Sequence, residues 1–137
     1  ICARLNLRLV GLPGDAEGID TDALETAIRD HRPKALYLNP TLNNPTTRTI
    51  SIARRQSIAD VIIAHHLPLI EDDAYGFIPP HLPAPLASFA PDLVWHIGGL
   101  AKCIGAGLRL AYTGASDQDH LGHAFALDDG TCNTLDH

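Results

Sequence analysis

The sequence predicts an α/β fold, a doubly wound and mostly parallel sheet with helices on both faces. Short apolar runs suited to buried strands alternate with longer segments of helical periodicity. Glycine- and proline-rich segments separate them. This strand–helix–strand–helix–strand order is typical of parallel sheets. The 137 residues suffice for one domain and are too few for two ordinary ones.

Each expected element has a local signal. Five segments have strand patterns: 5–10, 35–38, 69–71, 93–97 and 109–113. Three segments have helical patterns: 22–32, 51–65 and 116–125. The first helix has a capping-box pattern at Asp22 and Glu25 and ends before Pro33, while Ser51 can cap the second.

The remaining segments are expected to lack regular structure. Residues 39–49 are rich in asparagine, proline and threonine, which is typical of a loop. Residues 79–91 contain too many prolines for a helix or a central strand. The tail 127–137 has no clear periodicity and is expected to be irregular. Trp95, in a strand pattern, is expected in the core.

Composition excludes several classes of protein. Lys and Arg total 10 against 16 Asp and Glu, a formal net charge of −6, so this segment has no electrostatic footprint for nucleic acid. Its apolar runs are far shorter than the roughly 20 residues of a membrane span. Three cysteines without metal-ligand spacing favour a reducing cytoplasm. The absence of methionine suggests a piece of a longer protein.

Polar clusters follow three of the expected strands, where parallel sheets bind ligands. They are Asn43-Asn44, Asp72-Asp73 and Lys102. Lys102 is a lone lysine in a glycine-rich run, and the lone Arg109 follows seven residues later. Lysine forms Schiff bases with carbonyls, and arginine grips phosphates. A cofactor with both an aldehyde and a phosphate, such as pyridoxal phosphate, would need this pair.

Four motifs together resemble one family. They are Asn39-Pro40-Thr41-Leu42-Asn43-Asn44-Pro45-Thr46, Glu71-Asp72-Asp73-Ala74-Tyr75-Gly76-Phe77, Ala101-Lys102 and Gly107-Leu108-Arg109-Leu110-Ala111-Tyr112. Over residues 4–115 the chain resembles the pyridoxal-phosphate enzymes of fold type I. The likeness is to the class I/II aminotransferases and to the aminotransferase-like domain of MocR-type regulators. It implies a partial cofactor-binding large domain over residues 1–137.

The resemblance implies a role for each matching residue. Lys102 would hold pyridoxal phosphate as an aldimine and shuttle the proton. Asp72 would pair with the pyridine nitrogen, and its neighbour Asp73 is expected to be a solvated strand end. Asn44 and Tyr75 would hydrogen-bond the phenolic oxygen of the cofactor. Arg109 would bind its phosphate.

Three positions depart from the family pattern. Thr47 stands where the family has glycine, and Gly99 where it has a phosphate-binding hydroxyl residue. Ala101 precedes the lysine, where serine is common. The departure at Thr47 weakens the match of the loop. Those before Lys102 predict reduced cofactor affinity, with a backbone amide replacing part of the lost phosphate contact.

The implied function is transamination between an amino acid and a 2-oxo acid by a cytoplasmic homodimeric transferase of amino acid metabolism. The isolated segment is expected to be inactive, because the family's substrate-carboxylate arginine lies in a later domain. One alternative is a pyridoxal-phosphate-sensing domain of a MocR-type regulator. Another is a fold whose chemistry has been lost. No metal site is expected, since His120 and His123 have no evident third ligand.

Overall fold

The computed structural model describes residues 2–105, 110–114, 124–128 and 131–135. In chain order, the helices are the 3₁₀ helix η1 (Cys2–Leu5), α1 (Thr21–His31), α2 (Ile52–Ala64) and the 3₁₀ helix η2 (Leu86–Ser88). The strands are β1 (Gly14–Asp15), β2 (Gly18–Ile19), β3 (Leu36–Leu38), β4 (Leu69–Asp73), β5 (Val94–Gly99), β6 (Leu110–Gly114), β7 (Ala124–Asp128) and β8 (Thr131–Leu135).

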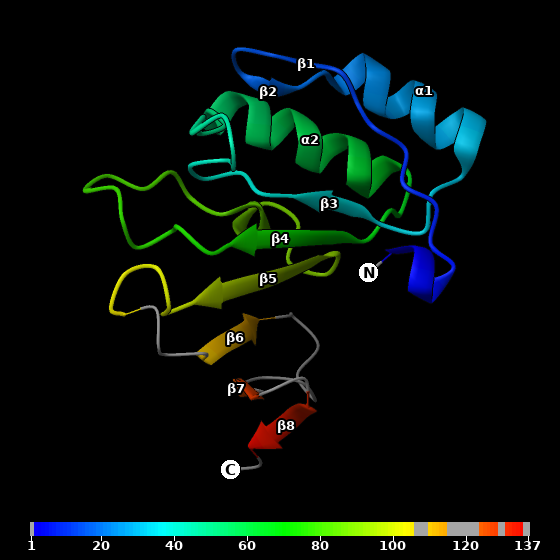
Figure 1. Ribbon diagram of the computed structural model, residues 1–137. Coiled ribbons are helices and arrows are strands. Elements are labelled where there is room, and N and C mark those ends of the chain that lie inside the picture. Colours follow the sequence, from blue (N-terminus) through cyan, green and yellow to red (C-terminus); the bar gives the residue numbers. More distant parts are fainter. Residues whose placement is uncertain (1, 106–109, 115–123, 129–130, 136–137) are drawn as a thin grey trace.

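One mixed sheet organises the molecule, in the order β3-β4-β5-β6-β7-β8 (Figure 1). Strands β3, β4 and β5 are parallel, and every pair from β5 to β8 is antiparallel. The predicted α/β class is confirmed, but parallel pairing is confined to β3–β5. The β5–β6 connection, residues 100–109, is shorter than the dozen or more residues that parallel neighbours need for a crossover.

The two faces of the parallel half differ in their cover. Alternate strand residues point to opposite sides. The helix face carries Leu36, Leu38, Leu69, Glu71 and Val94, which are buried. Its apolar members belong to one core with residues of α1, α2 and η2.

The open face carries Tyr37, Ile70, Asp72 and Trp95, on the side of the sheet opposite the core that α1, α2 and η2 share. Tyr37 is 60% exposed and Trp95 is 45% exposed. The expectation of a core tryptophan is therefore wrong. Helices α1, α2 and η2 contribute to the core on one face of the sheet, whereas helices of this kind were expected on both faces.

Side-chain caps fix where the helices begin. Asp20 caps α1, its Oδ1 accepting from the Ala23 amide at 2.8 Å, so the predicted cap at Asp22 is wrong by two residues. Helix α1 ends at His31, before Pro33, as predicted. Ser51 caps α2, as predicted, its hydroxyl accepting from the Arg54 amide at 3.3 Å.

Two segments differ from the sequence-based expectation. Residues 6–10 form no strand, and Leu7 and Leu9 are exposed, because a strand needs a hydrogen-bonding partner that alternation alone does not supply. The described residues of the tail are not irregular, since 127–128 belong to β7 and 131–135 to β8, and these strands pair as antiparallel neighbours. The predicted helix 116–125 lies mostly outside the described residues, and Ala124 and Phe125 at its end belong to β7.

Arg55 is a buried charge that joins α2 to the loop after β3. Its side chain is 1% exposed. The guanidinium donates to the Ile50 carbonyl at 3.0 Å, and to the Pro40 carbonyl and the Thr41 hydroxyl at 3.1 Å each. It also lies 3.7 Å from Oε1 of Glu71, on β4. Helix, loop and strand are thus held by one side chain.

Glu71 is the fully buried partner of Arg55. Its Oε1 accepts from the Leu86 amide at 2.8 Å, and its Oε2 accepts from the Ala87 amide at 3.1 Å, both in η2. On β5, Nδ1 of His96 lies 3.0 Å from the same Oε2. A buried carboxylate with this many donors is well satisfied.

Glu71 and His96 shift each other's protonation. Burial is the largest influence on the pKa of Glu71 and would raise it, but the His96 hydrogen bond and the η2 amides together lower that pKa. The hydrogen bond to Glu71 raises the pKa of His96 against the opposing effect of burial, and Asp73 also raises it while Arg55 lowers it. The ionised Glu71 and the protonated His96 therefore each favour the charged form of the other.

Arg55→Met should lower the free energy of unfolding by about 3–5 kcal/mol, because it leaves the Glu71 carboxylate buried without its arginine. Guanidinium-induced unfolding measures the loss. The control is Arg29→Met, which removes the exposed partner of Asp30 in α1 and should cost less than about 0.5 kcal/mol. Equal losses in the two variants would show that the buried pair does not stabilise the fold.

His96 should make stability fall with rising pH in the neutral range. Its contribution is fully present below about pH 6.5, the usual histidine pKa, and is lost as the pH rises through the higher folded-state pKa. His96→Asn should flatten this slope. His66→Asn, at an exposed position without a carboxylate partner among the described residues, should retain it. Unfolding free energies between pH 6 and pH 9 test both, and an unchanged slope in His96→Asn would contradict the assignment.

Candidate functional site

The predicted polar clusters meet at one edge of the sheet. Because β3, β4 and β5 are parallel, the segments that follow them leave at the same edge (Figure 1). The loop with Asn44 follows β3, Asp72 lies near the end of β4, and the turn with Lys102 follows β5. Residues far apart in sequence are thereby gathered at the edge where parallel sheets bind ligands.

Asp72 is held in place on the open face. Its Oδ2 accepts a hydrogen bond from the Tyr37 hydroxyl at 2.6 Å, and its Oδ1 accepts from the Ala74 amide at 3.3 Å. The Asp72 carbonyl accepts from Nδ2 of Asn39 at 2.6 Å. The carboxylate therefore has a fixed orientation, with lone pairs left for a further donor.

Asn39 connects the two loops of the site. Besides its contact with Asp72, its Oδ1 accepts from the backbone amide of Asn44 at 3.0 Å. Asn44 is exposed and precedes Pro45 through a cis peptide bond. Asn39 thus places Asn44 beside the end of β4.

Sequence reasoning assigned no role to Tyr37 or Asn39. A signal for Tyr37 was present, since a tyrosine between the apolar residues Leu36 and Leu38 belongs on the opposite face of a strand from both. Its pairing with Asp72 depends on the register between β3 and β4, which one strand alone does not contain.

At Thr47, where the family has glycine, the loop after β3 has a backbone conformation that favours glycine. Thr47 has φ +58°, in the left-handed region that a β-branched residue rarely adopts. The conformation costs an ordinary L-residue about 1–2 kcal/mol. Hydrogen bonds close the loop nonetheless, from the Thr47 amide to the Asn43 carbonyl at 2.6 Å and from the Asn43 amide to the Arg48 carbonyl at 2.8 Å. The departure from the family therefore adds strain, and the turn still forms.

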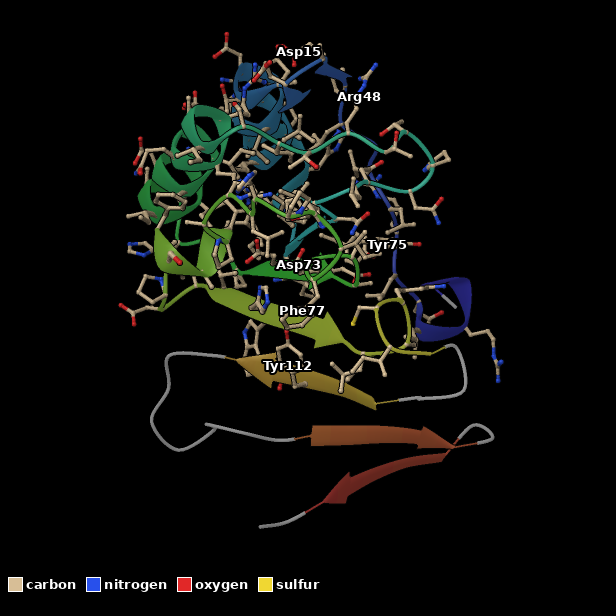
Figure 2. All side chains as sticks on the ribbon, turned by 90° about the vertical axis from the view of Figure 1, so that its left-hand side faces the viewer. Asp15, Arg48, Asp73, Tyr75, Phe77 and Tyr112 are labelled. Carbon is tan, nitrogen blue, oxygen red and sulfur yellow. The ribbon has the colours of Figure 1, made fainter. Side chains whose placement is uncertain are left out.

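The polar groups of Tyr75 and Lys102 have no hydrogen-bond partner among the described residues. Figure 2 shows Tyr75 on the side of the sheet away from α2. Lys102 is exposed, in a turn closed by the Cys103 and Ile104 amides donating to the Leu100 carbonyl. Within the part of the chain that is described, neither side chain has a hydrogen bond or ion pair, and the same holds for the side-chain amide of Asn44. All three groups are free to bind a ligand.

Asp73 points the other way from Asp72. Its side chain is 17% exposed, and its Oδ2 lies 3.9 Å from Nε2 of His96 on the helix face. A Cβ on Gly76 would overlap the same Oδ2, so glycine makes room for this carboxylate. The expectation that Asp73 is a solvated strand end is wrong.

Gly98 makes room for a side chain. A Cβ there would overlap Cζ of Tyr112, whose ring also lies 6.3 Å from those of Phe77 and His96. Figure 2 shows Asp73, Phe77 and Tyr112 following one another from β4 toward β6. The space that a side chain at Gly98 would need is therefore occupied by the ring of Tyr112.

Three residues that the sequence singled out lie outside the described part of the chain. Arg109, the predicted phosphate ligand, lies outside the described residues, as do His120 and His123. Among the described residues no group of three or more His, Cys, Asp or Glu side chains could hold a metal ion. None of the helices in these described segments combines the length and the hydropathy that a membrane span requires.

Known proteins with similar sequences include a transaminase and a transcriptional regulator. The chain is 37% identical over 119 residues to the uncharacterized HTH-type transcriptional regulator YdeF of Bacillus subtilis (strain 168), covering 86% of this chain and 26% of that protein. It is 34% identical over 112 residues to a 2-aminoadipate transaminase of Thermus thermophilus, covering 77% of this chain and 28% of that enzyme. The chain thus spans about a quarter of the length of these relatives.

A solved structure shares the fold. LysN, the α-aminoadipate aminotransferase of Thermus thermophilus, superposes with a TM-score of 0.72 at 33% identity, over 82% of this chain and 31% of that chain. It was determined with N-(5'-phosphopyridoxyl)-L-leucine, a compound that joins a phosphopyridoxyl group to an amino acid.

The family model for aminotransferase class I and II matches residues 10–132, most of the chain. The predicted family is confirmed, and with it pyridoxal phosphate as the expected cofactor. This chain belongs to the class I and II aminotransferase family.

Proposed function

We propose that this chain is the cofactor-binding segment of a longer pyridoxal-phosphate-dependent transaminase, which transfers an amino group between an amino acid and a 2-oxo acid. One observation carries the proposal. At the edge where β3, β4 and β5 end, the Asp72 carboxylate is fixed by its own hydrogen bonds. The polar ends of Asn44, Tyr75 and Lys102 have no hydrogen-bond partner among the described residues. A ring with polar groups around its rim needs such a set of contacts.

The chemistry of these groups suits pyridoxal phosphate. When bound, the cofactor supplies an aldehyde carbon that bonds to amines and a ring that accepts an electron pair. The amine of Lys102 would hold that carbon and move the proton. Asp72 would accept a hydrogen bond from the protonated ring nitrogen. Asn44 and Tyr75 would donate to the phenolic oxygen, and Arg109 would bind the phosphate.

Substrate recognition belongs to the wider protein. No residue of this chain is assigned to the substrate carboxylate, so the amino acid and the 2-oxo acid are identified only by class. A homodimer and a cytoplasmic location are further parts of the proposal and rest on the family likeness. Light scattering of the whole protein would test the dimer, which a monomeric mass would contradict.

A second candidate function is a pyridoxal-phosphate-sensing domain of a transcriptional regulator. The observation that favours it is the 37% identity to YdeF, a protein named as an HTH-type regulator. The two functions share Asp72 and Lys102 and differ in the rest of the protein. Amino-group transfer by the whole protein without DNA binding supports the transaminase. DNA binding that changes with pyridoxal phosphate, without turnover, supports the regulator.

Lys102→Ala should abolish covalent capture of pyridoxal phosphate. The chain contains two lysines, Lys34 and Lys102, so it provides its own control. Lys34 is exposed before β3, at the opposite edge of the sheet from Lys102. After borohydride reduction of the whole protein with pyridoxal phosphate, peptide mass spectrometry should find the adduct on Lys102 in the wild type and in Lys34→Ala. An adduct on Lys34, or none on Lys102, would contradict the assignment.

Asp72→Asn should weaken pyridoxal phosphate binding roughly 10- to 100-fold, because a hydrogen bond to a charged group contributes about 1.5–3 kcal/mol. Asp73→Asn is the matched control, since the neighbouring carboxylate faces His96 on the helix face. It should leave the dissociation constant within about threefold of wild type. Absorbance titration of the whole protein measures both constants. Equal effects of the two substitutions would contradict the assignment of Asp72, and not Asp73, to the cofactor.

A further inference from the structure

We propose that Tyr37 is a positioning residue for the ring nitrogen of the cofactor, acting through the Asp72 carboxylate. The inference rests on the proposed function, since it needs Asp72 to contact the ring. It assigns a role to a residue of β3 that none of the four sequence motifs includes.

The geometry of the contact is that of a strong hydrogen bond. The Tyr37 hydroxyl lies 2.6 Å from Oδ2 of Asp72, within the range of about 2.5–2.7 Å for hydroxyl–carboxylate bonds. Tyr37 pairs with Ile70 in the parallel register, so Asp72, two residues further along β4, lies on the same face. The tyrosine thus reaches diagonally across to the neighbouring strand at the site edge.

The contact leaves little freedom to the carboxylate. Tyr37 holds Oδ2 and the Ala74 amide holds Oδ1, so both oxygens have a donor within the protein. Burial, followed by the hydrogen bond and charge of Asp72, raises the pKa of Tyr37 to about 12. The phenol therefore keeps its proton at neutral pH and donates to Asp72. A ring nitrogen would meet an acceptor that is already oriented.

An alternative is that Tyr37 only stabilises the sheet, through the packing of its ring. It is 60% exposed on the open face, and an aromatic side chain there would suit packing alone. Packing depends on the ring, whereas positioning depends on the hydroxyl. Tyr37→Phe removes only the hydroxyl, so it separates the two roles.

The test compares two ligands of the whole protein. One is pyridoxal phosphate, and the other is its 1-deaza analogue, in which a CH group replaces the ring nitrogen. Tyr37→Phe should weaken pyridoxal phosphate binding about fivefold. This is less than the full contribution of a charge-assisted hydrogen bond, because Tyr37 acts through Asp72. It should leave the dissociation constant of the analogue unchanged, because the analogue has no ring nitrogen for Asp72 to contact.

Two further variants complete the design. Tyr112→Phe is a control that removes the hydroxyl of another tyrosine, one that packs on Gly98 and His96. It should leave the preference between the two ligands unchanged. In an Asp72→Asn background, Tyr37→Phe should have no additional effect on pyridoxal phosphate binding, since the acceptor it acts through is gone. Circular dichroism establishes that each variant is folded.

The outcomes separate this inference from the proposed function. If the wild type does not bind pyridoxal phosphate, or if Asp72→Asn does not weaken binding, the proposed function fails and the role of Tyr37 fails with it. If Asp72→Asn weakens binding but Tyr37→Phe has no effect, or weakens both ligands equally, only the inference is overturned. Selective loss of pyridoxal phosphate binding in Tyr37→Phe supports it.

Discussion

The buried pair of Arg55 and Glu71 is the contact on which the rest of this structure depends. Charges inside a protein must be satisfied, and each of the two draws its partners from different segments. Arg55 holds both ends of the loop after β3, and Glu71 holds η2 and His96 on β5. The pair thus fixes the segments on either side of β4 with respect to that strand. Asp72 directly follows Glu71, so a contact on the helix face also determines where the open-face carboxylate lies.

The acidic run of β4 shows how strand geometry divides similar side chains between different roles. Alternation turns Glu71 and Asp73 toward the helix face and Asp72 toward the open face. Two carboxylates therefore act with His96 in the interior, and one is left at the edge for a ligand. A shift of the strand by one residue would exchange these roles and bury the wrong groups. The buried bonds of Glu71 disfavour that shift, so they also preserve the site.

The sequence predicted those features that local chemistry determines. Ser51 caps α2 through its own hydroxyl, and Pro33 limits α1, because both effects act within a few residues. Features that need a partner were missed. Residues 6–10 alternate between apolar and polar side chains but pair with no described strand. Trp95 is of a residue type common in cores but lies on the open face. In the candidate site, too, local motifs were predicted and contacts between strands were missed. Motifs indicated Asp72, while its bond to Tyr37 follows only from the register of β3 and β4.

The site combines fixed and free groups, and this division suits the proposed chemistry. Tyr37 and the Ala74 amide hold the Asp72 carboxylate, and Asn39 holds the backbone of Asn44, so contacts to a ring would be oriented before it binds. No residue of the described part of the chain restrains the Lys102 side chain in this way in its turn after β5. A group that only orients a ring gains from rigidity, since little order is lost on binding. A group that forms a bond and then moves a proton needs more than one position, and an exposed lysine on a short turn has that freedom.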